Sequence, residues 1–149
     1  MRLLDKCKIP YRSYFYDSTL SLGGMQVAKL LGEELEKVFK TLVTVGESKA
    51  HYVFMLPVNK GLDLKKAAKC VGEKSVAMIK EKELFALTGY VHGGCSPLCM
   101  KKQFRTLIDI SAVDKQSIFF SAGKIGAQVE TTLDGMKTAI SFNLADLTE

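Results

Sequence analysis

Residues 38–56 read VFKTLVTVGESKAHYVFML, and this stretch decides the fold of the chain. Two apolar runs rich in β-branched and aromatic residues, 38–45 and 51–56, flank the polar segment 46–50, which is typical of two strands joined by a turn. One charged residue, Lys40, interrupts the first run. An ammonium group inside an apolar strand is unfavourable unless it reaches water, a partner or a pocket, so Lys40 is a candidate site residue.

Strand-like and helix-like segments alternate through the rest of the chain. Further short strands are predicted at residues 11–16, 75–79, 105–110, 116–121, 127–132 and 141–147. Helices are predicted at residues 22–31, 63–71 and 81–88, with a last short helix near the C-terminal end. Asp63 and Asp134 are the expected caps of the second and last helices, and Leu64, Ala68 and Val71 are expected to face the core. Because strands outnumber helices and the late turns are short, a mixed or antiparallel sheet is favoured over a doubly wound parallel one.

The composition is that of an ordinary globular protein. The 149 residues, 47% apolar and 25% charged, suit one domain with its own core. No apolar run approaches the ~20 residues of a membrane helix, and no secretory signal begins the chain, so we expect a cytoplasmic location. The four cysteines are expected to be reduced. A net charge of +5 is compatible with a polyanionic partner without requiring one.

A second informative stretch is the glycine loop, defined here as residues 88–97, TGYVHGGCSP. Closely spaced glycines let a ligand approach the backbone and leave N–H groups free to donate. The N–H groups of Gly93 and Gly94 are therefore candidates for an oxyanion hole. A tight turn that needs positive φ is the alternative explanation for the same glycines.

Five motifs occur in order along nearly the whole chain. They are KIPY at 8–11 with YD at 16–17, VFKTL at 38–42, LDLKKAAK at 62–69, the glycine loop, and SAGK at 121–124. In this order they resemble the freestanding Cys-tRNA(Pro) deacylases of the YbaK/EbsC type, in the superfamily of prolyl-tRNA synthetase editing domains. The resemblance implies an α/β fold of the α+β type, with a twisted, mixed, mainly antiparallel and β-barrel-like sheet flanked by helices.

The resemblance also implies roles for particular residues. Lys40 is the essential lysine of the family's Phe-Lys-Thr-Leu motif, and Gly93 is the other expected catalytic residue. With an ordinary lysine pKa of about 10.4, Lys40 is expected to position the substrate and stabilise developing negative charge rather than to act as a general base. Substrate binding is expected from Tyr16, Thr41, Gly94 and Ser121. A core tyrosine, a strand threonine and a turn serine remain the alternative readings of three of these four.

The implied activity is trans-editing hydrolysis of mischarged Cys-tRNA(Pro), with lyase as a second label for the reaction. Neither His51 nor His92 belongs to a recognisable triad pattern, which fits a substrate-assisted mechanism in which the cysteine thiol attacks its own ester. The implied partners are the aminoacylated acceptor end of tRNA and prolyl-tRNA synthetase, with no cofactor, metal or membrane. The alternatives are deacylation of an alanyl, seryl or threonyl group, and a non-catalytic module that binds a synthetase or tRNA.

Two features leave questions open. His92, Cys95 and Cys99 suggest zinc, but a structural site needs four ligands, and the fourth would have to come from Cys70 or Cys7. Cys99 and the pair at 23–24, Gly-Gly, depart from residues that the family usually carries, so the preferred aminoacyl group stays open.

Two basic segments are candidates for phosphate contacts with the acceptor stem. They consist of Lys65, Lys66 and Lys69, and of Lys101, Lys102 and Arg105. A solvated charged surface is the alternative reading of both.

Overall fold

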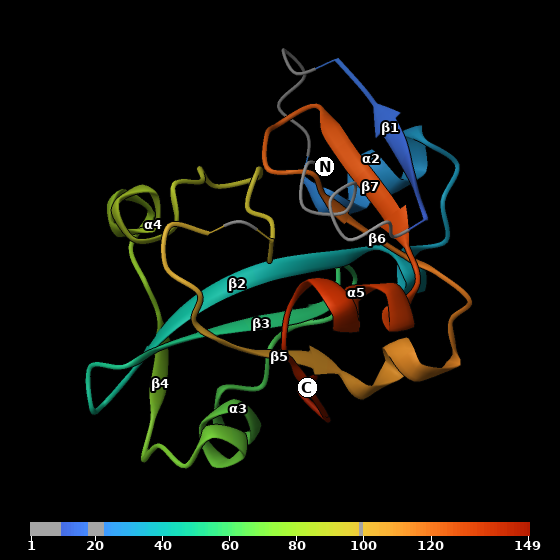
Figure 1. Cartoon of the computed structure of the whole chain (residues 1–149). Coiled ribbons are helices and arrows are strands. Elements are labelled where there is room, and N and C mark those ends of the chain that lie inside the picture. Colours follow the sequence, from blue (N-terminus) through green and yellow to red (C-terminus); the bar gives the residue numbers. More distant parts are fainter. Residues whose placement is uncertain (1–9, 18–22, 99) are drawn as a thin grey trace.

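The computed structural model describes residues 10–17, 23–98 and 100–149, and within them the strands form two sheets (Figure 1). The smaller sheet is antiparallel throughout and has the order β1 (Tyr11–Phe15), β7 (Ala127–Thr131), β6 (Ile118–Ser121). The larger sheet has the order β4 (Val76–Met78), β2 (Phe39–Gly46), β3 (His51–Pro57), β5 (Arg105–Asp109), β8 (Asn143–Ala145). This sheet is mixed, because β5 runs parallel to both of its neighbours.

Four α-helices flank the sheets in the described part of the chain. They are α2 (Gly24–Leu30), α3 (Leu64–Val71), α4 (Glu81–Thr88) and α5 (Leu133–Ala139). Two short 3-10 helices, Leu35–Lys37 and Ile110–Asp114, were not predicted, since single turns leave little periodicity in a sequence. No described helix has the length and apolar character needed to cross a membrane.

The ends of helices α3 and α5 confirm one prediction and show that two others are wrong. The Asp63 carboxylate accepts hydrogen bonds from the N–H groups of Lys65 and Lys66 at 3.0 and 3.1 Å, as expected of an N-cap. Leu64, expected to face the core, is instead 42% exposed, because it occupies the first turn on the solvent side. Asp134 is not the cap of α5, since the Thr132 hydroxyl accepts the hydrogen bond from Gly135 N–H at 3.0 Å.

The two sheets meet where β2 begins. Val38 pairs with Phe119 in a parallel bridge, and the Val58 N–H donates to the Val38 carbonyl at 2.8 Å. A single bridge joins the sheets here in place of a full ladder, so they curve toward a barrel without closing into one. The predicted α+β fold, with mainly antiparallel sheets flanked by helices, is confirmed.

The core lies on both faces of the larger sheet. On one face, Phe39 and Met55 pack with Phe120 of the smaller sheet and Met136 of α5. On the other face, Phe54 packs against α3. Because side chains alternate along a strand, the burial of Phe39 in the first core directs Lys40 to the face that carries α3.

Candidate active site

Lys40 occupies a half-buried position on β2, opposite Leu56 of β3. With the other described residues it makes neither an ion pair nor a hydrogen bond. Burial lowers the pKa of Lys40 below its usual range, and the charge of Glu149 counteracts part of this shift. A charged group in this state is available to an anionic ligand, because no carboxylate of the described chain neutralises it directly.

The strand register brings Ser121 toward Lys40. Val38 and Phe119 are paired in parallel, and Lys40 and Ser121 are each two residues further along their strands. Alternation places them on the same face as the bridged pair. The Ser121 hydroxyl oxygen accepts a hydrogen bond from the Gly123 N–H at 3.2 Å, so Ser121 shapes the turn and still has a proton to donate.

The same face of the smaller sheet continues with polar side chains. Gln128 of β7 pairs with Ser121 on one side and with Tyr14 on the other. Tyr16 follows Tyr14 with the same orientation, and its N–H donates to the Gly126 carbonyl at 3.0 Å. The predicted residues Tyr16 and Ser121 therefore lie on one surface, with Gln128 beside them.

Gln128 is the residue that the sequence analysis missed. It is 4% exposed, and its Oε1 atom makes no hydrogen bond with the rest of the described structure. The alternation of small or apolar and polar residues along β7 is a signal for a polar face there, but only the pairing of β7 with β6 identifies Ser121 as its neighbour.

A buried acid lies near Gln128. Neither carboxylate oxygen of Glu33 is accessible to solvent, and neither makes a hydrogen bond to a described residue. Burial raises the pKa of Glu33 to about 7, and the nearby Gln128 amide counteracts part of the rise. Glu33 is thus poised to change its charge near neutral pH.

The glycine loop rests on the turn between β6 and β7. In Figure 1 the yellow segment that follows α4 reaches this orange turn. A Cβ atom on Gly94 would lie 3.0 Å from the Ile125 nitrogen and 3.2 Å from the Lys124 Cα, so no side chain fits there. The glycine loop and the Ser-Ala-Gly-Lys motif, which residues 98–120 separate in the sequence, are therefore brought together at Lys124, three residues after Ser121.

The geometry reduces the predicted oxyanion hole to one donor. The Gly94 N–H already donates to the Val91 carbonyl at 3.0 Å. The N–H of Gly93 makes no hydrogen bond within the described ranges, and its φ of +83° is one that glycine adopts without strain. Gly93 remains the candidate donor, whereas Gly94 is suited to close approach of the backbone.

Thr41 is separated from the other predicted residues. It neighbours Lys40 along β2, so its side chain faces the opposite side of the sheet, together with Phe39 and Val43. Its hydroxyl oxygen is buried and has no partner in the described structure. The structure therefore does not bring the Thr41 and Lys40 side chains together.

No enzyme nucleophile is apparent among the described residues. Burial raises the pKa of the Cys95 thiol to about 12, so it stays protonated at neutral pH. The His51 ring packs 5.5 Å from that of Phe104, and His92 lies 3.9 Å from the Glu81 carboxylate. No three His, Cys, Asp or Glu side chains of residues 10–17, 23–98 and 100–149 cluster as metal ligands, and Cys7 and Cys99 fall outside these ranges.

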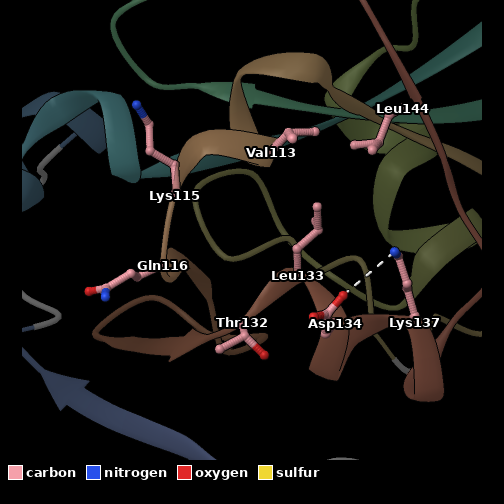
Figure 2. A pocket seen from close by; sticks show the side chains of 8 residues that line it. All are labelled: Val113, Lys115, Gln116, Thr132, Leu133, Asp134, Lys137 and Leu144. Atoms are coloured by element: carbon pink, nitrogen blue, oxygen red, sulfur yellow. Dashed lines mark ion pairs between the residues drawn. The ribbon is translucent and has the colours of Figure 1, made fainter.

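A separate hollow of about 350 Å³ lies beside α5 (Figure 2). At one edge of it the Asp134 and Lys137 side chains, both on α5, form an ion pair at 3.6 Å. Its lining includes none of the predicted site residues and no serine, cysteine or histidine. The lining residues are Val113, Lys115, Gln116, Thr132, Leu133, Asp134, Lys137 and Leu144. We therefore place the candidate site at the junction of β2 and β6.

Comparisons with known proteins agree on one family. The sequence matches the family described as "Aminoacyl-tRNA editing domain" over residues 25–138. It is 43% identical over 149 residues to the "Putative Cys-tRNA(Pro)/Cys-tRNA(Cys) deacylase EbsC" of Enterococcus faecalis, covering 99% of this chain and 91% of the relative.

Two solved structures share the fold at low sequence identity. One is described as a "putative trans-editing enzyme for prolyl tRNA synthetase"; it is 24% identical, with a TM-score of 0.83 over 93% of this chain and 87% of its own. The other, the hypothetical protein APE2540, is 20% identical, with a TM-score of 0.87 over 99% and 97% of the two chains.

Proposed function

We propose a function from one premise: this chain belongs to the aminoacyl-tRNA editing domain family, which it matches over residues 25–138. The proposed activity is hydrolysis of the ester bond between a mischarged amino acid and tRNA. The amino acid we propose is cysteine and the tRNA is tRNA(Pro), because the relative at 43% identity carries that name. Discrimination after charging is needed because cysteine and proline are close in volume, and size selection alone separates such pairs poorly. The term lyase is wrong for this activity, since the overall reaction of a deacylase is hydrolysis.

The observation that carries the proposal is the shared face of Lys40 and Ser121 at the junction of β2 and β6. Lys40 is charged, half-buried and unpaired within the described chain, and Ser121 has a proton to donate. The N–H of Gly93, on the glycine loop, is the third candidate donor. Such a set binds the ester carbonyl and stabilises negative charge on its oxygen.

The chemistry we propose uses the substrate's own thiol. The cysteine sulfur, having lost its proton, attacks the ester carbonyl carbon, and the carbonyl oxygen becomes an oxyanion facing the Lys40 ammonium. The carbon–oxygen bond to the ribose then breaks, and the ribose oxygen takes up a proton. The resulting cyclic thioester is opened by water to free cysteine. The enzyme supplies orientation and charge stabilisation. The reaction therefore needs no nucleophile from Cys95, whose thiol is protonated, and no base from His51 or His92.

The partners of this activity follow from its substrate. The aminoacylated acceptor end of tRNA must reach Lys40, and exposed lysines at 101 and 102 are suited to contact its phosphates. We propose that prolyl-tRNA synthetase presents the tRNA, because a chain of 149 residues offers little surface with which to select one tRNA unaided.

The test of the proposed function is a panel of mischarged tRNAs. The purified protein is incubated with tRNA(Pro) carrying cysteine, alanine, serine or threonine, and release of each amino acid is followed over time. We expect cysteine to be released fastest. Faster release of alanine, serine or threonine would transfer the assignment to that group, and no release from any member would leave a non-catalytic binding module as the function.

A further inference from the structure

Phe85 of α4 and Lys101, which lies after the glycine loop, form an exposed pair, here called the Phe85 platform. Phe85 is 56% exposed, and the Lys101 Nζ atom lies 4.9 Å from the centre of its ring. The Lys101 N–H donates to the Thr88 carbonyl at 3.0 Å, and its side-chain stem lies over Gly89, where a Cβ would be 3.3 Å from the lysine Cγ. The ammonium is therefore held next to an aromatic ring that water still reaches.

The platform lies beside the start of the glycine loop. Glu81 and Phe85 are four residues apart on α4 and thus occupy the same side of the helix. His92 of the glycine loop is 3.9 Å from Glu81, which brings the loop to that side. Because the same loop contacts the β6–β7 turn through Gly94, it connects the platform with the candidate site.

Exposed groups along this path alternate between apolar and basic. Val91 and Ile125 are 48% and 41% exposed, and Lys124 is exposed beside Ile125. Lys102 lies 5.9 Å from the Phe104 ring, so a second ammonium is held near an aromatic side chain. Glu81, an acidic residue on this path, has its carboxylate 3.9 Å from the His92 ring. Single-stranded nucleic acid is recognised by this combination, in which bases stack on exposed rings and cations follow the phosphates.

We propose that the Phe85 platform stacks on an unpaired nucleobase near the 3′ end of the RNA whose terminal ester reaches Lys40. The inference rests on the proposed function for the identity of the RNA, and it adds a contact outside the reaction centre. Stacking holds the single strand along the glycine loop, while Lys101 and Lys102 neutralise phosphates on either side of the stacked base.

Binding of an uncharged RNA hairpin tests the proposal without any chemistry. The probe mimics an acceptor arm with a single-stranded 3′ end in CCA, and a second hairpin lacks the overhang. Phe85→Ala should weaken binding of the first hairpin about tenfold and leave the second unchanged, as expected for the loss of one stacked base. Phe15→Ala, which removes an aromatic ring that is 66% exposed on β1, is the matched control and should change neither affinity.

A tryptophan reporter gives a direct view of stacking. The chain has no tryptophan, so Phe85→Trp introduces a single fluorophore, with Phe15→Trp as its control. The overhang hairpin should quench only the fluorophore at position 85, with a salt dependence that weakens by about one unit of slope in Lys101→Ala.

The two proposals fail in distinguishable ways. Equal affinity of Phe85→Ala and wild type for the overhang hairpin, or no quenching at position 85, would overturn the platform even in an active enzyme. The proposed function is judged separately, by release of cysteine from a minimal cysteinyl-adenosine ester, which lacks the nucleotides before the terminal adenosine that the platform is proposed to hold. Phe85→Ala should retain wild-type turnover on that ester, and a loss there would also overturn the platform by placing Phe85 in the reaction centre.

Discussion

Replacing Lys40 with methionine should slow deacylation strongly and leave the fold intact. The methionine side chain has similar length and apolar character, so it fills the half-buried position on β2 without the charge. Loss of one group that stabilises a developing oxyanion lowers kcat by about 100- to 1,000-fold, or about 2.7–4 kcal/mol. The assay is release of labelled cysteine from Cys-tRNA(Pro) under single-turnover conditions, alongside thermal unfolding.

Lys40→Met should lower activity, but it should not lower the stability of the folded protein. Burial lowers the pKa of Lys40 in the folded protein, so the charged lysine opposes folding below that pKa, and this penalty disappears as the pH rises through it. At neutral pH the melting temperature of Lys40→Met should therefore equal or exceed that of the wild type. Lys37→Met is the control, because Lys37 lies just before β2 and pairs with Glu34 at 3.9 Å. A folded Lys40→Met protein with near wild-type turnover would refute the role of Lys40.

Three further changes test neighbouring parts of the account. Cys95→Ala should keep full activity, because its thiol is protonated at neutral pH, and should lose about 1 kcal/mol of stability on removal of a buried group, measured by urea unfolding. The contribution of Glu33 to the stability of the folded protein should fall as pH rises from about 4.5 through about 7, because the folded state binds a proton on Glu33 that the unfolded state has released. In a pH series, the melting temperature of the wild type should therefore decline more, relative to Glu33→Gln, across this range. Gly94→Ala should reduce both stability and activity, since its Cβ would meet the backbone of the β6–β7 turn, whereas Gly23→Ala, whose Cβ would meet only Gln26 Oε1 at 3.9 Å, should change stability little. Unchanged melting of Gly94→Ala would show that the loop–turn contact is looser than described.

Local patterns predicted the elements of this fold well. The paired runs at 38–45 and 51–56 become β2 and β3, because alternating burial and a polar turn act within a few residues of each other. The cap of α5 was misplaced because Thr132 and Asp134 are both good capping residues. Only the backbone geometry, with extended Thr132 ahead of the first turn, decides between them.

Long-range pairing determined what the sequence could not predict. Lys40 and Thr41 are consecutive in the motif, yet a strand directs them to opposite faces. Gln128 lies between Ser121 and Tyr14 because β7 pairs with β1 as well as with β6, and no local pattern encodes the pairing of β7 with β1. The predicted pair of N–H donors became one for a local reason, since a turn within the glycine loop lets the Val91 carbonyl accept the N–H of Gly94.

The central claim is that the substrate supplies the nucleophile. The most direct measurement compares single-turnover rates on cysteinyl-tRNA(Pro) and seryl-tRNA(Pro), whose side chains differ little in size. A substrate-assisted reaction predicts much faster release of cysteine, because a thiolate forms far more readily than an alkoxide and attacks the ester carbonyl more effectively. Equal rates on the two esters would contradict the account and indicate an activated water molecule as the nucleophile.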